Sequence, residues 1–183
     1  CLFCYNKEYN NFKWRYKNAE IVLEELEYIQ KRFNPQYLFF VDDEFFISTK
    51  RAKEIMEGMI TRKFAFQYKA CMRISILKRL EPDYLKLIDD SGCFEMPVGA
   101  ESGSQRVLDL IKKGISPKDT LLAVEKTKDM KVIPQLSFMS GFPTETVEEF
   151  HQTIELIDKI WKINPRIKIN GLFFASPFPG TEL

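Results

Sequence analysis

Strand-like and helix-like segments alternate along the whole chain, and this alternation constrains the fold more than any other feature of the sequence. Residues 18–33 carry apolar side chains at helical spacing, and residues 37–41 form a short continuous apolar run soon after them. Such a run is typical of a parallel strand that is buried on both faces. Strands separated by helices predict an α/β fold with right-handed β/α units around a parallel sheet. The five predicted strands are 37–41, 64–72, 93–98, 132–139 and 167–174.

Capping and breaking residues set the ends of the predicted helices. Asn34-Pro35 ends the first helix, because the residue before a proline disfavours helical backbone. Gly114 is the expected stop of a helix over 104–113. Thr146 and Glu149 have the spacing of a capping box at the start of the last helix. The remaining predicted helices follow Ser48, cover 84–91 and run from Pro117 to near Lys131.

Polar and turn residues collect where the predicted strands end. In a parallel barrel the C-terminal ends of the strands form the face that binds ligands. We therefore expect these residues to line a functional site. They are Asp42-Asp43-Glu44, Arg73, Gly99-Ala100-Glu101 and Gly141-Phe142-Pro143.

Composition indicates one globular domain over residues 1–183 and gives no signal of a nucleic-acid partner or a membrane span. The chain is 45% hydrophobic, which suffices for a substantial core. Its 27 lysines and arginines nearly balance 26 aspartates and glutamates, so the charge favours neither nucleic acid nor an anionic membrane. No apolar run approaches the roughly 20 residues of a membrane span. Four cysteines, two of them inside apolar segments, favour a reducing compartment, and we predict the cytoplasm.

The chain opens with Cys1-Leu2-Phe3-Cys4, two cysteines at C-x-x-C spacing. Thiolates at this spacing bind zinc or iron–sulfur iron, because both side chains of one tight turn reach the same metal or cluster. Two ligands do not complete such a site, and no Met precedes Cys1, so we expect residues upstream to carry a third thiolate. Cys71 and Cys93 lie inside apolar segments and are expected to be small core residues.

Short motifs with a common order accompany this cysteine pair. They are Cys1-x-Phe3-Cys4, Phe39-x-Val41-Asp42-Asp43, Gly99-Ala100-Glu101-Ser102-Gly103-Ser104, Gly141-Phe142-Pro143-Thr144-Glu145-Thr146 and Pro177-Phe178-Pro179-Gly180-Thr181. In this order they resemble the motifs of radical S-adenosylmethionine enzymes, in particular the cobalamin-associated branch. The resemblance spans the whole chain. It departs from the family pattern in two respects: the first cluster cysteine is absent, and the chain contains no cobalamin-binding domain.

The resemblance implies a partial (β/α)6 TIM-like barrel whose first strand and first cluster cysteine lie upstream. It implies a 4Fe-4S cluster with Cys1 and Cys4 as two of its ligands, and S-adenosylmethionine chelated to the open iron. One electron then cleaves the sulfonium bond to give methionine and a 5′-deoxyadenosyl radical. The implied reaction is methyl transfer or radical rearrangement on an unknown small molecule. An external donor such as flavodoxin or ferredoxin would supply the electron, and cobalamin would come from a domain outside this chain.

The resemblance also implies roles for individual residues. Phe3 would contact the adenine of S-adenosylmethionine. Asp42 and Asp43 suit its amino group, because carboxylates accept charged hydrogen bonds. Glu101 would accept hydrogen bonds from the ribose hydroxyls. Arg73 lies at the end of its strand and is expected to pair with the methionine carboxylate or with Glu101, since a guanidinium fork matches a carboxylate.

Three further residues fall in cofactor-contacting segments of the family. Gly141 allows the backbone to approach a flat ligand closely. Ser102 belongs to the motif that contains Glu101, and Glu145 belongs to the motif that begins at Gly141. We expect all three to contact the cofactor.

Several of these residues also have a structural explanation that requires no cofactor. The cysteine pair is also compatible with a zinc knuckle, Glu44 with a solvated helix entry, and Glu101 or Arg73 with a structural ion pair. Lys113-Gly114 also matches the family pattern, but a lysine and a glycine at this position are sufficiently explained as the end of a helix. His151 is expected to have no catalytic role. For the whole chain, the alternative function is a barrel that binds a metal or S-adenosylmethionine without turnover.

Overall fold

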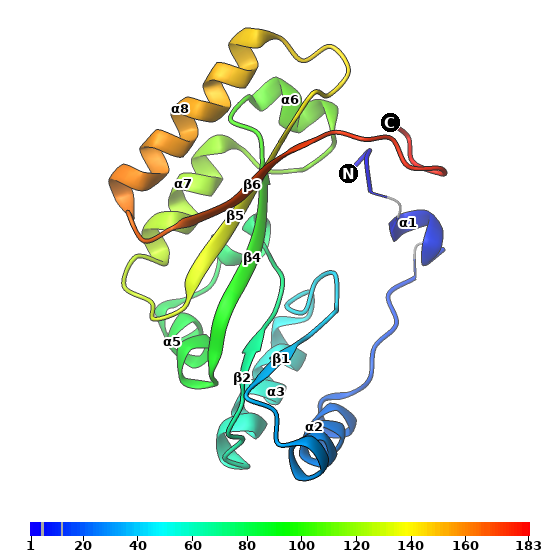
Figure 1. The fold of residues 1–183 in the computed structure, drawn as a ribbon, viewed down its shortest axis with the longest axis vertical. Helices are drawn as coiled ribbons and strands as arrows, with labels where there is room; N and C mark the ends of the chain where they lie inside the picture. Colours follow the sequence, from blue (N-terminus) through cyan, green and yellow to red (C-terminus); the bar gives the residue numbers. More distant parts are fainter. Residues whose placement is uncertain (5, 12) are drawn as a thin grey trace.

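In the described part of the chain, six strands form one parallel sheet, and five of them follow the order β1-β2-β4-β5-β6 (Figure 1). The computed structural model describes residues 1–4, 6–11 and 13–183. The predicted α/β class and parallel sheet are confirmed, and within the described residues the sheet stays open between β1 and β6. The strands are β1 (Tyr37–Phe39), β2 (Gln67–Lys69), β3 (Met72–Arg73), β4 (Cys93–Glu101), β5 (Ile133–Ser140) and β6 (Lys168–Phe174).

Helices separate most of the strands and cover one face of the sheet. Figure 1 shows α5, α7 and α8 on one side of the sheet, and the N-terminal segment with α1 on the other. Within the described part of the chain, none of the helices has the length and apolar character needed to span a bilayer. The helices are α1 (Asn6–Tyr9), α2 (Ala19–Phe33), α3 (Thr49–Thr61), α4 (Ile74–Leu77), α5 (Pro82–Asp90), α6 (Gln105–Leu110), α7 (Pro117–Lys126) and α8 (Val147–Ile163).

The core lies between the sheet and these helices. Along β5 buried and half-buried residues alternate, so Leu136 and Phe138 belong to the core while Ser137 and Met139 are on the opposite face. The expectation that the run 37–41 is a strand buried on both faces is wrong, because in the edge strand β1 Phe39 is 53% exposed. The reason is that helices cover only one face of the open sheet, which leaves the other face accessible.

Several predicted elements differ from those observed, among them the strands 37–41 and 93–98, which are observed as Tyr37–Phe39 and Cys93–Glu101. The predicted strand 64–72 is two short strands, β2 and β3, and β3 pairs with β4 rather than extending β2. Helix α7 ends at Lys126, several residues before Lys131. Helix α6 ends at Leu110, and the left-handed residue that closes it is Lys112 (φ 52°), not Gly114.

The predicted capping box at Thr146 and Glu149 is confirmed, and it also joins α8 to α6. The buried Glu149 carboxylate accepts hydrogen bonds from Ser104 Oγ at 3.0 Å and from Arg106 Nε at 2.6 Å. The Arg106 hydrogen bond and the Thr146 N–H lower the pKa of Glu149 to about 2. A Cβ at Gly103 would collide with the backbone of α8. These contacts fasten the loop after β4 to α8 and so position Glu101.

Candidate functional site

Residues 1–4, here called the thiolate loop, form a turn at the C-terminal end of the sheet. The Cys4 N–H donates to the Cys1 carbonyl at 3.3 Å, which places both half-buried cysteines on one turn. Two backbone bonds hold the loop from either side: Leu2 N–H donates to the Ile111 carbonyl at 2.9 Å, and Glu182 N–H donates to the Leu2 carbonyl at 3.1 Å. The loop is therefore clamped between the end of α6 and the C-terminal segment.

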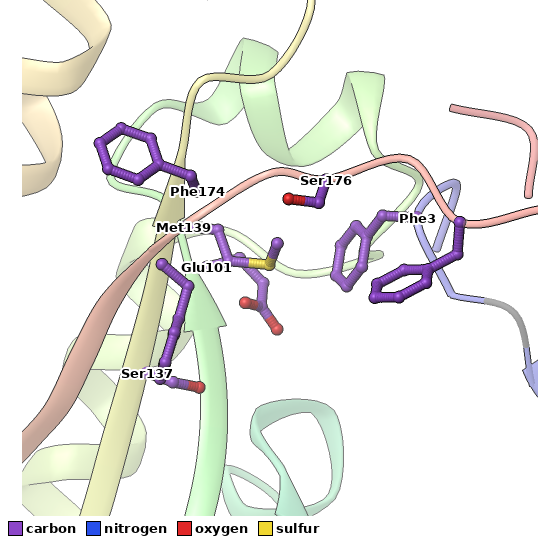
Figure 2. Close-up of a pocket in the computed structure, with 8 residues that line it drawn as sticks. Phe3, Glu101, Ser137, Met139, Phe174 and Ser176 are labelled. Carbon is purple, nitrogen blue, oxygen red and sulfur yellow. The ribbon is translucent and has the colours of Figure 1, made fainter.

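A pocket of about 410 Å³ lies beside the thiolate loop, at the ends of β4, β5 and β6. Two predicted cofactor-binding residues, Phe3 and Glu101, line it together. Figure 2 shows the Glu101 carboxylate directed into the space bordered by Met139 and Phe3. The lining residues are Phe3, Glu101, Ser137, Met139, Phe173, Phe174, Ser176 and Phe178. The pocket thus presents one carboxylate within a wall of aromatic and thioether side chains.

Glu101 makes a buried ion pair with Lys113. Oε1 of Glu101 lies 2.5 Å from Nζ of Lys113, and the two side chains are 8% and 12% exposed. Both groups lie over Gly99, where a Cβ would collide with the carboxylate and the ammonium. The explanation of Glu101 as part of an ion pair is confirmed, although its partner is Lys113 and not Arg73. Sequence reasoning assigned Lys113 only to a helix end, although its match to the family pattern was a usable signal.

The aspartates after β1 lie outside the pocket lining. Asp42 and Asp43 are exposed, and the Asp43 carboxylate accepts a hydrogen bond from the side chain of Asn6, which follows the thiolate loop. Arg73 is also exposed, at the N-cap of α4 and paired in register with Gly99. The structure thus places these three residues around the strand ends without bringing them to Glu101.

Ser102 and Glu145 hold loops together. The Ser102 hydroxyl is completely buried, lies 3.3 Å from the Thr153 hydroxyl and accepts from the Ser104 N–H at 3.1 Å. Glu145 Oε2 accepts from the Phe142 N–H at 3.2 Å. Both residues therefore support the loops that surround the pocket, and neither lines it.

The turn that begins at Gly141 supports the thiolate loop. Gly141 has φ 78°, a left-handed conformation that glycine adopts without strain, and its N–H donates to Glu145. The next residue, Phe142, is buried and packs its ring 5.8 Å from the ring of Phe3. Through Phe142, the turn supports the Phe3 ring from within the core.

Glu44 is mostly buried, so its assignment to a solvated helix entry is wrong. The two residues after it, Phe45 and Phe46, are fully buried in the core, and their packing holds the adjacent Glu44 away from solvent. Oε1 accepts from the Phe46 N–H at 3.2 Å, while Oε2 is buried with no hydrogen-bond partner among the described residues. Burial raises the pKa of Glu44 to about 7, against the opposing effects of that N–H and of the Arg73 charge.

We expect Glu44→Gln to stabilise the full-length protein at alkaline pH. Because the pKa of Glu44 is about 7 when folded and 4.5 otherwise, the folded state binds more protons between these values, and stability falls as pH rises through them. Glutamine removes this loss, so the variant should be more stable by at least about 1 kcal/mol at pH 8 and close to wild type at pH 4.5. Urea denaturation at both pH values measures this. The exposed Glu148→Gln is the control, and an equal difference at both pH values would contradict the assignment.

The cysteines differ in their capacity to bind iron. Burial raises the pKa of Cys93 to about 12, and burial together with the Glu44 charge raises the pKa of the half-buried Cys71. Metal ligation requires the thiolate, so these two thiols are poor ligands. Among the residues that the structure describes, no three His, Cys, Asp or Glu side chains gather to hold a metal ion. The donor chemistry of Cys1 and Cys4, two half-buried cysteines on one turn, suits iron–sulfur iron.

Comparison with curated proteins identifies relatives that match the whole chain. An uncharacterized methyltransferase of Pyrococcus horikoshii is 31% identical over 183 residues, which are 100% of this chain and 38% of the relative. The bacteriochlorophyllide d C-12(1)-methyltransferase of Chlorobaculum tepidum is 27% identical over 184 residues, covering 99% of this chain and 38% of that protein. The chain thus spans well under half the length of these relatives.

Solved structures share the fold. The radical S-adenosylmethionine methyltransferase TsrM from Kitasatospora setae, with cobalamin and a [4Fe-4S] cluster bound, has a TM-score of 0.73 and 18% identity over 91% of this chain and 32% of its own. The cobalamin-dependent enzyme OxsB, with aqua-cobalamin bound, has a TM-score of 0.76 and 16% identity over 93% of this chain and 31% of its own. The family model described as the radical SAM superfamily matches residues 1–157. This chain, with its thiolate loop at the C-terminal end of an open parallel sheet, belongs to the radical SAM superfamily.

Proposed function

We propose that this chain is the core of an enzyme that binds a 4Fe-4S cluster and S-adenosylmethionine and cleaves the latter reductively. The observation that carries the proposal is the pocket in which Phe3 of the thiolate loop and the Glu101 carboxylate meet. It lies where a parallel α/β fold gathers its ligand contacts, at the C-terminal ends of the strands. The match to the radical SAM superfamily model supports S-adenosylmethionine as the ligand of this pocket.

Cys1 and Cys4 would hold two irons of the cluster. When bound, such a cluster supplies the single electron that cleaves the carbon–sulfur bond of S-adenosylmethionine. The chain's own contribution is to fix the two sulfurs, because the Leu2 backbone is bonded on one side to Ile111 and on the other to Glu182. A loop held in this way loses little conformational freedom on binding, which favours affinity.

The pocket would place the adenosyl group beside the thiolate loop. Glu101 is an acceptor for hydroxyl groups, and Phe3 offers a ring against a flat base. The side chains of Met139, Phe173 and Phe178 form apolar walls that would exclude water from a reactive intermediate. Asp43 adjoins the segment after the thiolate loop through Asn6, and we propose that it meets the charged amino group of the ligand.

Methyl transfer is the reaction that the relatives favour. Both curated relatives above are named methyltransferases, and the OxsB and TsrM structures contain cobalamin. We therefore propose methyl transfer to a small molecule, with cobalamin held by a domain outside these residues and an electron donor such as flavodoxin or ferredoxin. We propose a cytoplasmic setting, since the reduced cluster requires a reducing compartment.

Product analysis separates an enzyme from a binding module. The full-length protein, purified and reconstituted without oxygen, is mixed with dithionite, methyl viologen and S-adenosylmethionine, and the products are separated by liquid chromatography. We expect 5′-deoxyadenosine with methionine from reductive cleavage, or S-adenosylhomocysteine from methyl donation, in amounts that grow with time. Protein without its cluster is the control. Binding of S-adenosylmethionine with neither product would favour the non-catalytic barrel.

A further inference from the structure

The end of α6 has an unusual sequence for its geometry. The N–H of Lys113 donates to the Leu108 carbonyl at 2.9 Å, and the N–H of Lys112 donates to the Asp109 carbonyl at 3.0 Å. This pair of bonds is a Schellman motif, whose left-handed position usually holds glycine. Here that position is Lys112, at φ 52°, a conformation that costs a residue with a Cβ some free energy. The turn at the end of α6 therefore carries backbone strain at Lys112.

The turn brings three consecutive residues to three parts of the site. The Ile111 carbonyl accepts from Leu2 in the thiolate loop. Lys112 Nζ lies 2.6 Å from Glu182, an exposed pair that contributes little. The Lys113 side chain turns inward, where its ammonium meets the Glu101 carboxylate. The backbone that clamps the thiolate loop thus also delivers the cation that holds Glu101.

Glu101 itself occupies a constrained position. Its φ is 65°, again left-handed, and the register between β4 and β5 shifts at this residue. Gly99 leaves the space into which the carboxylate and the Lys113 ammonium fit. Because the Lys113 ammonium contacts Oε1, it restrains rotation of the carboxyl group while the group still borders the pocket.

We propose that Lys113 is a positioning residue for Glu101: its ammonium holds one carboxylate oxygen so that the other is presented to the hydroxyl groups of an adenosyl ligand in the pocket. The inference rests on the proposed function, since it takes the ligand to carry a ribose diol. It goes beyond that function in assigning the orientation of the acceptor to a residue that does not line the pocket. A fixed acceptor binds a diol more tightly than one that must be ordered on binding.

A double-mutant cycle tests this assignment in the full-length, cluster-loaded protein. The variants are Glu101→Gln, Lys113→Met and the two together, and S-adenosylhomocysteine is the probe, titrated by calorimetry. We expect each single variant to weaken binding about tenfold or more, and the double variant to bind as weakly as Glu101→Gln alone, because Lys113 acts only through Glu101. Lys113→Arg should recover most of the affinity, since it keeps the cation. Lys112→Gly is the matched control, because glycine suits the same turn, and it should bind within threefold of wild type.

Several results would overturn the assignment. Wild-type affinity in Lys113→Met would do so, and so would a further tenfold loss in the double variant relative to Glu101→Gln, since Lys113 would then act on the ligand directly. If Lys113→Met does not fold because the Glu101 charge is left unpaired, Lys113→Gln, which keeps a polar head without the cation, replaces it as the single variant, and wild-type affinity in Lys113→Gln would equally overturn the assignment. Failure of the proposed function is distinguished separately, by the absence of both nucleoside products in the wild-type protein.

Discussion

Replacing either cysteine of the thiolate loop should abolish cluster binding. In Cys1→Ala and Cys4→Ala, iron and acid-labile sulfide in the reconstituted full-length protein are expected to fall to the background level, because a cluster with few protein thiolates cannot lose one without detaching. The expected loss is nearly complete because both sulfurs come from one turn that the Leu2 backbone clamps in place. Iron and sulfide analysis together with the visible absorbance of the cluster measures the outcome.

The two remaining cysteines provide the matched controls. Cys93→Ala removes a buried thiol of high pKa, and Cys71→Ser changes a half-buried one, so both variants should retain iron at the wild-type level. Cys93→Ala should cost some stability through the cavity it leaves. Wild-type iron content in both thiolate-loop variants would remove the basis for a cluster at this site.

Removing the pocket carboxylate should weaken ligand binding while leaving the cluster in place. Glu101→Ala deprives the ligand hydroxyls of their acceptor, and an unpaired buried polar group costs about 1 to 3 kcal/mol. We therefore expect the affinity for S-adenosylmethionine to fall roughly tenfold to a hundredfold. Calorimetry on the full-length protein measures the affinity, and iron analysis of the same samples confirms that the cluster is unaffected.

Two other carboxylates test the geometry of this prediction. Asp43→Ala should weaken binding less than Glu101→Ala, because Asp43 is exposed and lies outside the pocket lining. Glu148→Ala, an exposed carboxylate on α8, should leave the affinity unchanged. An effect of Asp43→Ala larger than that of Glu101→Ala would move the ligand toward the end of β1 and away from the pocket.

Local patterns predicted those parts of the fold that depend on neighbouring residues. The apolar runs and their separation predicted a parallel sheet, and the structure has one. The spacing of Thr146 and Glu149 predicted a capping box that the structure contains, because such a cap involves only four consecutive residues. The predicted end of α6 was wrong because two left-handed residues, Lys112 and Gly114, lie close together, and only Gly114 is recognisable from its residue type.

Contacts between distant segments decided the chemical environment of the site. No pattern within residues 42–46 distinguishes an exposed Glu44 from a buried one, since its burial depends on how Phe45 and Phe46 pack into the core. Likewise, Lys113 and Glu101 are twelve residues apart, and their ion pair exists because the turn at Lys112 and the absence of a side chain at Gly99 make room for it.

The sequence by itself therefore determined the α/β class, the parallel sheet, the motif set that resembles the radical S-adenosylmethionine enzymes and the cysteine pair, because each is encoded by spacing along the chain. Only the tertiary structure decided that Phe3 and Glu101 share one pocket while Asp42, Asp43 and Arg73 do not, and that Lys113 holds Glu101. The physical reason is that parallel β/α units bring every strand end to the same edge of the sheet, whereas side-chain direction there depends on bulges, left-handed residues and packing that act across the fold.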